Sequence, residues 1–275
     1  MEKREVIYRH SGAVRITHWV NALVLLFLLM SGLQIFNGHP ALYIGPKSTF
    51  DDPLMAMGAV QDGDTATGVT TIFGHSFDTT GVLGVATDAD GQLDERGFPW
   101  SLTLPGHRDL AMGRRWHFFF AWLWVANGAC YLAWSLATRH LVRDLAMRPR
   151  DWRAIPRSIA EHLRFHHPVG EEALRYNPLQ KLAYLGVVFV LAPLAVLTGL
   201  SMSPQMDGVL GWWLALVGGR QSARTLHFVV MALFVLFAVV HVLMVVYAGP
   251  VNEMRSMLSG RFRVRWPRGT GEDGT

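Results

Sequence analysis

Histidine is the residue type whose placement in this chain could carry the most chemistry. The sequence holds twelve histidines, and four of them lie within long apolar stretches: His18, His117, His227 and His241. An imidazole surrounded by hydrocarbon is costly, so it usually serves as a metal ligand or a proton carrier. A single such residue can instead be a neutral histidine hydrogen-bonded to a neighbouring helix. Four together favour a functional site.

The spacing of two of these histidines is informative. His227 and His241 are fourteen residues apart in one apolar stretch. In an α-helix this spacing places both on one face, within about 40°, and separates them by about 21 Å along the axis. Such a helix would present one imidazole near each side of a membrane.

Four stretches without Asp, Glu, Lys or Arg would position these residues, namely 16–36, 116–136, 182–206 and 225–251. Each reaches the roughly 20 apolar residues that span a bilayer. Only 17% of the 275 residues are charged, whereas a soluble domain carries about 25%. The sequence predicts an all-α membrane protein, a single domain over residues 1–275 with four transmembrane helices. The first stretch is too long for a signal peptide, so we expect it to be retained.

Lysine and arginine are distributed unevenly among the connections. Residues 1–15 carry four of them, residues 137–177 carry eight, and the segment after the last stretch carries five. The long connection 37–113 carries only three, beside ten acidic residues. By the positive-inside rule, both termini and 137–177 are predicted to be cytoplasmic and 37–113 to face the opposite compartment.

This topology sets the depth of each histidine. The first helix runs outward, so His18 lies near the cytoplasmic surface, level with His241. The second helix runs inward, so His117 lies near the outer surface, level with His227. Two pairs of imidazoles are therefore predicted, one in each leaflet, with the two members of each pair on different helices.

Two opposed neutral imidazoles in an apolar slot are what a six-coordinate haem b requires. Helix-bundle interiors commonly hold such cofactors. The sequence therefore predicts two haem b groups as cofactors, with these histidines as iron ligands. The alternative from another class is a histidine-dependent proton or metal-ion transporter. Such a path would more naturally add Asp or Glu within the spans, and these spans contain none.

Arginines next to the histidines are candidates for binding the anionic haem propionates. Arg15 precedes His18 by three residues, Arg224 precedes His227 by three, and Arg114 and Arg115 lie just before His117. Each arginine alone is equally typical of a membrane interface.

Small residues could leave room for a flat macrocycle beside a helix backbone. Ser31-Gly32-Leu33 is echoed by Thr198-Gly199-Leu200, and Gly128 lies in the middle of the second stretch. Close helix packing explains glycine at these places equally well. Pro193 is expected to kink the third helix.

The composition excludes or disfavours some classes of protein. The single cysteine, Cys130, provides no disulfide framework, and the absence of a C-x-x-C-H motif excludes covalently attached c-type haem. The net charge of +4 could suggest nucleic acid, but basic loops of a membrane protein mark its cytoplasmic side. No nucleic-acid partner is predicted.

The connection 37–113 is a long polar insertion rich in Gly, Asp and Thr. It has few regular apolar periods, so we expect little core of its own, and either docking on a soluble partner or disorder in isolation. Residues 88–95 have a faint likeness to a calcium loop. They lack its full twelve-residue pattern, which favours an Asp/Gly turn.

Other polar residues give weaker indications. Quinone binding leaves little sequence signature, and Asn21, Gln180 and Tyr184 are candidates that an interface explains equally well. Four further histidines are expected to be solvated in the cytoplasmic segments: His10, His162, His166 and His167. The apolar piece 208–219 is too short to cross a bilayer and is expected at the interface.

Several segments together resemble one family: Arg15-Ile-Thr-His18-Trp19, Gly113-Arg114-Arg115-Trp116-His117, His227 with His241, and Tyr176-Asn177-Pro178-Leu179-Gln180-Lys181. They are similar to the di-haem cytochrome b subunits of nickel-iron hydrogenases and formate dehydrogenases. The long connection, including 68–84 and 98–110, departs from that pattern. It looks more like the cytochrome b subunits associated with periplasmic molybdopterin oxidoreductases of the sulfite-oxidase type.

The resemblance implies a multi-pass subunit of the bacterial inner membrane. Such a subunit passes electrons between a periplasmic oxidoreductase, here molybdopterin-dependent, and the membrane quinone pool of a respiratory chain. It implies that His117 and His227 hold the outer haem and that His18 and His241 hold the inner one. It implies no substrate chemistry beyond the oxidation or reduction of quinone.

Overall fold

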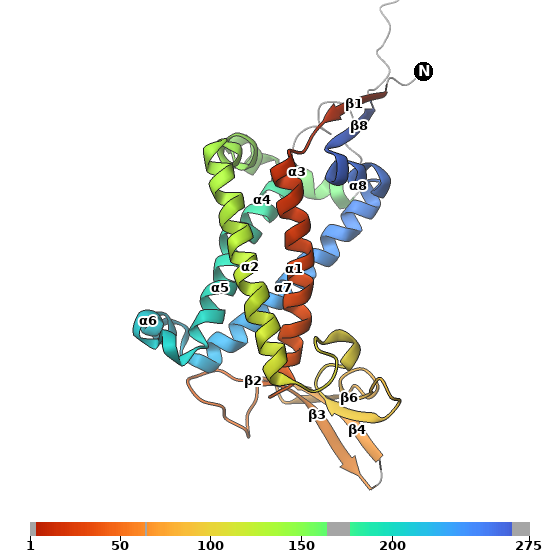
Figure 1. Cartoon of the computed structure of the whole chain (residues 1–275), viewed down its shortest axis with the longest axis vertical. Coiled ribbons are helices and arrows are strands. Elements are labelled where there is room, and N and C mark those ends of the chain that lie inside the picture. The colour runs from red at the N-terminus through yellow and green to blue at the C-terminus, as the bar shows by residue number, and fades with distance from the viewer. Residues whose placement is uncertain (1–3, 64, 164–176, 266–275) are drawn as a thin grey trace, which may run out of the picture. The chain divides into compact units, whose positions relative to one another are not determined.

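The computed structural model describes residues 4–63, 65–163 and 177–265 (Figure 1). The chain divides into two compact units. Unit 1 is formed by 1–19, 127–193 and 233–275, and unit 2 by 20–126 and 194–232. The long helices α1, α2 and α7 contribute residues to both units, so each unit contains parts of several spans.

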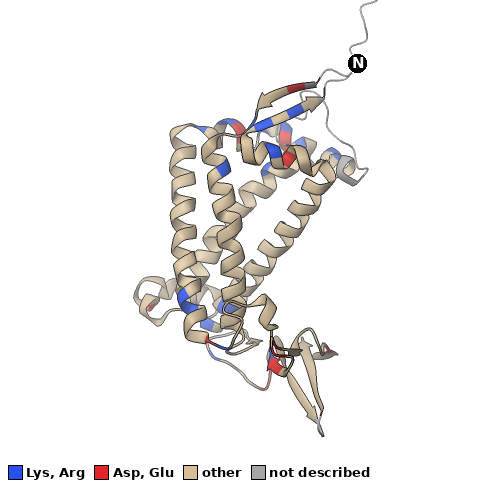
Figure 2. Cartoon of the chain, turned by 45° about the vertical axis from the view of Figure 1, so that its right-hand side comes forward, with Lys and Arg blue, Asp and Glu red and all other residues tan. Residues whose placement is uncertain are grey.

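Four helical segments of the described chain are long and apolar enough to cross a membrane. They are α1 (Gly12–Phe36), α2 (Leu110–Ala137), the run Pro178–Ser201, and α7 (Arg220–Ala248). Along these helices Lys and Arg lie near the ends, and the apolar lengths between carry none (Figure 2). By length and composition, this is the four-helix architecture that the sequence predicts.

The third span is a composite helix. It begins as α4 (Pro178–Gly186), passes through a π-helical turn (Val187–Leu191) and continues as α5 (Ala192–Ser201). Pro193 has no N–H to donate to the preceding turn, which accounts for irregular helix at this point. At its start, Asn177 Oδ1 accepts from the Leu179 N–H at 2.9 Å, and the side chain of Gln180 accepts from the Asn177 N–H at 3.2 Å.

The rest of unit 1 surrounds the start of α1 and the end of α7. Strands β1 (Arg4–Tyr8) and β8 (Arg261–Arg265) pair antiparallel, and α8 (Pro250–Ser259) precedes β8. A π-helical turn (Leu141–Leu145) and α3 (Pro149–Leu163) follow α2.

Two polar contacts within unit 1 join elements far apart in sequence. Arg15 Nη1 donates to the Leu258 carbonyl at 2.6 Å, which ties α1 to α8. Lys181 Nζ lies 2.9 Å from Asp151 Oδ2, with both residues buried, which ties α4 to α3.

The long polar insertion lies in unit 2 and is folded into strands. Strands β2 (Ala41–Leu42), β3 (Met55–Asp62), β4 (Thr65–Ile72) and β5 (His75–Asp78) form an antiparallel sheet in that order. Strands β6 (Gly84–Thr87) and β7 (Leu93–Arg96) form a separate hairpin, and a short 3-10 turn (Trp100–Leu102) follows.

These strands make the fold class mostly helical rather than all-α. The insertion has little core of its own, as the sequence predicts. Its core includes residues outside it: buried Phe36 of α1 packs with Leu42 and Met57, and Phe98 and Phe228 pack against this cluster. Phe36 belongs to α1 and Phe228 to α7. The pattern of apolar residues within the insertion therefore does not reveal them.

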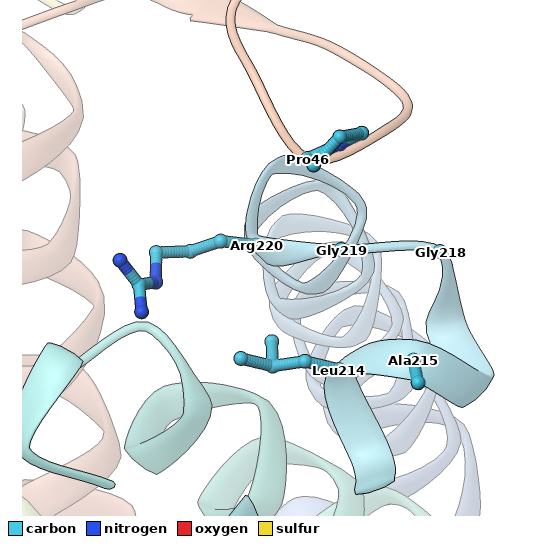
Figure 3. A pocket seen from close by; sticks show the side chains of 6 residues that line it. All are labelled: Pro46, Leu214, Ala215, Gly218, Gly219 and Arg220. Carbon is cyan, nitrogen blue, oxygen red and sulfur yellow. The ribbon is translucent and has the colours of Figure 1, made fainter. Parts of the chain in front are cut away.

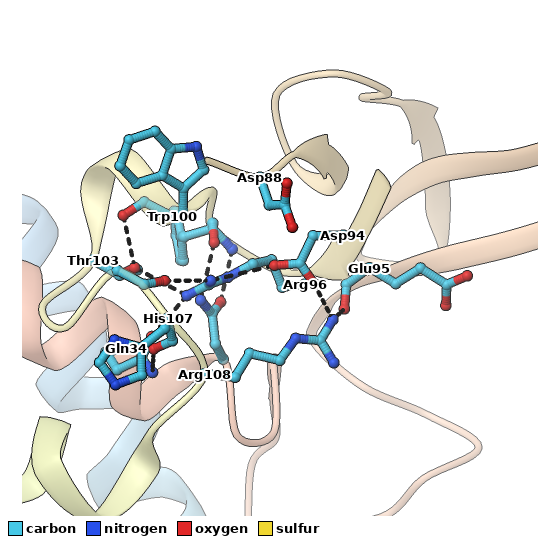
Figure 4. Close-up of polar contacts among 12 residues, drawn as sticks. Gln34, Asp88, Asp94, Glu95, Arg96, Trp100, Thr103, His107 and Arg108 are labelled. Carbon is cyan, nitrogen blue, oxygen red and sulfur yellow. Dashed lines mark hydrogen bonds and ion pairs between the residues drawn. The ribbon is translucent and has the colours of Figure 1, made fainter. Parts of the chain in front are cut away.

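A buried arginine fixes the far part of the insertion to α1 (Figure 4). Arg96 Nη2 donates to Gln34 Oε1 at 2.7 Å and to Thr103 Oγ1 at 2.9 Å. Its Nη1 donates to the Gly106 carbonyl at 2.8 Å and lies 3.3 Å from Asp94 Oδ2. Charge-assisted hydrogen bonds are the stronger kind, so Arg96 anchors this segment.

The acidic run 88–95 is a turn in this structure. Asp88 Oδ1 accepts from the Asp90 and Gln92 N–H groups, while Asp94 binds arginine. Among the described residues there is no group of three or more His, Cys, Asp or Glu that could hold a metal ion. The Asp/Gly turn is therefore the better interpretation of 88–95.

The segment after β2 holds the start of α7. The Gly45 carbonyl accepts from the Gln221 and Ser222 N–H groups, two donors that a helix start leaves without intrahelical partners. Gly219 has φ +112°, and a Cβ there would lie 2.6 Å from Pro46 Cα, so only glycine fits.

Helix α6 (Asp207–Val217) comes just before Gly219. It falls in the apolar piece 208–219, which is too short to cross a bilayer. A shallow hollow of about 440 Å³ lies beside Pro46 and Gly219 (Figure 3). None of the four span histidines lines it.

Candidate functional site

Unit 2 brings His117 of α2 together with His227 of α7. Their ring centroids are 6.4 Å apart and their planes are inclined by 71°. The pairing is the one that the depth of the two residues predicts. Both rings belong to the same compact unit.

Each of these rings is held by a hydroxyl and a glycine from another helix. His117 Nδ1 lies 3.1 Å from Ser31 Oγ, and His227 Nδ1 lies 2.9 Å from Thr198 Oγ1. A Cβ on Gly32 would lie 3.4 Å from His117 Cε1, and one on Gly199 would lie 3.3 Å from His227 Cε1.

The repeated Ser/Thr-Gly-Leu motif therefore forms two matching cradles for imidazoles. Gly32 and Gly199 let each ring approach the backbone of the facing helix. Gly128 differs, since a Cβ there would meet no atom of the described chain within 4 Å. Sequence reasoning noticed the motif but connected it with space for a cofactor; the hydrogen bonds of Ser31 and Thr198 to the histidines were missed.

Unit 1 brings His18 of α1 together with His241 of α7. Their ring centroids are 6.2 Å apart and the planes are inclined by 56°. Trp19 packs edge-on against His18, and Phe237 stacks on His241 at 5.7 Å. Trp19 is itself fixed by donating from Nε1 to the Met257 carbonyl at 3.1 Å.

The distance between ring centres, which is similar in both pairs, indicates what could lie between the rings. Two metal–nitrogen bonds of about 2 Å each, with half of each ring added, place the ring centres about 6 Å apart. A direct hydrogen bond of about 2.9 Å between ring nitrogens would bring the centres to about 5 Å. The observed 6.4 and 6.2 Å are longer than the second spacing and leave room for a metal ion bound by both rings.

The four predicted propionate-binding arginines are of two kinds. Arg15 and Arg224 donate to backbone carbonyls, Arg15 to Leu258 and Arg224 to Ala41 and His39. Arg114 and Arg115 are exposed at the start of α2, and the Arg114 guanidinium lies 5.9 Å from the centre of the Phe118 ring. Two of the four arginines thus have structural roles, and the two beside His117 are exposed.

The remaining candidate residues are less central. Gln180 closes the cap of α4, which gives it a structural role. His10, which was expected to be solvated, is partly buried. Burial, followed by the charge of Arg9, lowers the pKa of His10 from 6.5 to about 4. The side chain of His162, and all of His166 and His167, lie outside the described residues.

Three relatives are similar to this chain. A protein of Azospira oryzae named "Putative protein-methionine-sulfoxide reductase subunit YedZ1" is 25% identical over 251 residues, covering 88% of this chain and 92% of the relative. A "Probable Ni/Fe-hydrogenase B-type cytochrome subunit" of Cupriavidus necator is 27% identical over 157 residues, 52% of this chain and 64% of the relative. One of the same name from Rhodobacter capsulatus is 23% identical, over 88% of this chain and 74% of the relative.

No solved structure matches the chain. The family model described as prokaryotic cytochrome b561 matches residues 9–260, which include all four span histidines and both of their pairs. The family consists of b-type cytochromes, and the named relatives are subunits of oxidoreductases. The chain belongs to the prokaryotic cytochrome b561 family and is a multi-pass membrane electron-transfer subunit of that type.

Proposed function

We propose that the chain binds two haem b groups and passes electrons between an oxidoreductase outside the cytoplasm and membrane quinone. One haem would lie between His117 and His227, the other between His18 and His241. The observation that carries the proposal is the spacing of the rings, 6.4 Å in one pair and 6.2 Å in the other. Two separate pairs with this spacing support two haems.

The size of each histidine group favours haem over a bare metal ion. A protein site for a bare ion usually supplies three or four side-chain ligands. The described residues contain no group of three or more His, Cys, Asp or Glu that could act together. Haem iron needs only two axial ligands from the protein, because the macrocycle supplies the others. This disfavours the alternative of a metal-ion transporter.

The residues of the His117–His227 pair have distinct roles in this proposal. Bound haem would supply one-electron redox chemistry. The two rings would bind iron through Nε2, because their Nδ1 atoms face Ser31 and Thr198. The hydroxyls then fix the orientation of each ring.

Basic side chains complete the proposed site. Arg114 and Arg115 are exposed at the start of α2, two or three residues before His117. Guanidinium groups at a membrane edge are well suited to bind propionates. Arg15 and Arg224 would have to share their N–H groups between propionates and the carbonyls that they already bind.

The proposed orientation is that of the positive-inside rule. The termini and 137–177 would be cytoplasmic in a bacterial inner membrane, and 37–113 would face the periplasm. The strands of this insertion offer a folded surface for a partner, with Phe73 and Phe77 exposed near the β4–β5 turn. The relative named as a methionine-sulfoxide reductase subunit supports an oxidoreductase partner. Resemblance in the insertion suggests that this partner is molybdopterin-dependent.

Quinone is proposed to bind near the cytoplasmic haem, between His18 and His241. An electron entering at the periplasmic haem would then cross most of the bilayer before reaching quinone. Transfer in the opposite direction, from quinone to the periplasmic haem, would follow the same path. The two histidines of α7, fourteen residues apart on one helix, supply one ligand to each haem. At about 1.5 Å per residue this sets a rise of about 21 Å between the two ligands.

The test is to purify the protein from membranes, quantify haem b per chain, and add a water-soluble quinol to the oxidised protein. We expect two haems per chain and reduction of both by the quinol. Protein that is folded but contains no haem would contradict the proposal. Histidine-dependent proton flux across vesicles containing that haem-free protein would then favour the transporter.

A further inference from the structure

The hydroxyl groups beside His117 and His227 have fixed hydrogen-bond directions. Ser31 Oγ donates to the Phe27 carbonyl at 2.6 Å, and Thr198 Oγ1 donates to the Leu194 carbonyl at 2.6 Å. A carbonyl can only accept, and a hydroxyl has one proton to give. Each hydroxyl oxygen must therefore accept from the imidazole beside it.

This assignment fixes the tautomer of both rings. His117 and His227 carry their proton on Nδ1 and donate it to Ser31 and Thr198, at 3.1 and 2.9 Å. The Leu28 and Ala195 carbonyls are further acceptors for the same two rings. Each Nε2 then has a free lone pair, which is the form that binds a metal. Ser31 and Thr198 are fully buried, so water does not compete for these bonds.

His18 of the other pair is different. Its Nδ1 is buried and has no hydrogen-bond partner among the residues that the structure describes. His18 therefore lacks the hydroxyl acceptor that both His117 and His227 have.

Given the proposed function, we propose that Ser31 and Thr198 are positioning residues that lower the reduction potential of the haem held by His117 and His227. An Nδ1–H that donates to an oxygen leaves more electron density on the ring and makes Nε2 a stronger donor. A stronger axial donor stabilises ferric over ferrous iron. The other haem lacks this contribution from His18.

The test is a spectroscopic redox titration of the wild type and five variants of the whole chain. Ser31→Ala and Thr198→Val remove the hydroxyls, singly and together, and Thr198→Val keeps the side-chain shape. Thr198→Ser restores a hydroxyl. Ser201→Ala is the matched control, because Ser201 is fully buried on the same helix and donates only to the Thr198 carbonyl at 2.9 Å.

We expect the double variant to keep both haems and to raise the potential of one. At a fixed ambient potential, its ferrous-to-ferric ratio should rise about tenfold, which is about 59 mV for a one-electron couple. Each single variant should give part of this shift. The second haem, Thr198→Ser and Ser201→Ala should match the wild type.

Three outcomes would overturn the proposal. They are unchanged potentials in the double variant, an equal shift of both haems, and a shift in Thr198→Ser as large as that in Thr198→Val. In each of them the haems are present, so the proposed function stands. Wild-type protein without haem would instead contradict the proposed function itself.

Discussion

Replacing Gly199 by alanine should disturb His227 without weakening the helix that carries the substitution. The added Cβ would lie 3.3 Å from His227 Cε1, inside the about 3.5–4.0 Å that carbon atoms prefer. The ring must therefore move by a few tenths of an ångström. Alanine is favoured over glycine in a helix interior by about 1 kcal/mol. The helix should thus remain folded while the imidazole shifts.

The displaced ring should hold haem less tightly. Changes to the outer-shell partners of metal ligands typically cost 10–100-fold in affinity, and for one added methyl group we expect about tenfold. The assay is the rate at which the protein loses haem to an excess of a haem-binding acceptor. One of the two haems should leave faster, and the other should leave as in the wild type.

The control for this prediction is Gly211→Ala. Gly211 lies inside α6, and a Cβ there would meet no atom of the described chain within 4 Å. This variant should lose neither haem faster. If Gly199→Ala and Gly211→Ala release haem at the same rate, the close approach of Gly199 to His227 has no role in binding.

Three further predictions concern stability. Arg96→Met should lower the free energy of unfolding by about 3 kcal/mol, because it leaves buried acceptors without a donor, and should speed proteolysis of the insertion. Arg108→Met is the control: its side chain is 61% exposed, so the loss should be less than about 1 kcal/mol. Lys181→Met removes the buried ion-pair partner of Asp151, which keeps the Arg148 N–H at 3.0 Å and the Arg150 guanidinium at 3.9 Å. The free energy of unfolding in denaturant should fall by about 3 kcal/mol, and adding Asp151→Leu should recover most of it. The pKa of His10 in the folded chain is lowered to about 4. Between about pH 6.5 and 4 the unfolded chain therefore binds more protons than the folded chain. The melting temperature should fall as the pH is lowered through this range, and it should fall less in His10→Gln.

The spans and the histidine pairing could be predicted from the sequence because both rest on long-range regularities. Four uncharged stretches fix the number of crossings, and the position of each histidine within its stretch fixes its depth. His117 and His227, and His18 and His241, are brought together as that depth requires.

The folded insertion could not be predicted in the same way. Its core depends on Phe36 and Phe228 from two other helices. Its anchor, Arg96, binds Gln34, which is 62 residues away in sequence. Short strands with many small residues show little apolar alternation, so their pairing depends on contacts that only the tertiary structure displays.

The hydrogen bonds of Ser31 and Thr198 to the histidines could be predicted only in part. The matching tripeptides at Ser31 and Thr198 were visible in the sequence, and their likeness could have suggested equal roles. What was missing was the register between helices, which decides that each hydroxyl faces an imidazole rather than lipid. That register sets the 3.1 and 2.9 Å contacts.

The central claim is that two histidine pairs each hold one haem, and haem content in a paired substitution series tests it most directly. We expect His117→Ala and His227→Ala to lose the same single haem, and their double variant to lose no more. His18→Ala and His241→Ala should lose the other haem, and His18→Ala combined with His227→Ala should lose both. If His18→Ala and His227→Ala instead remove the same haem, the pairing is wrong.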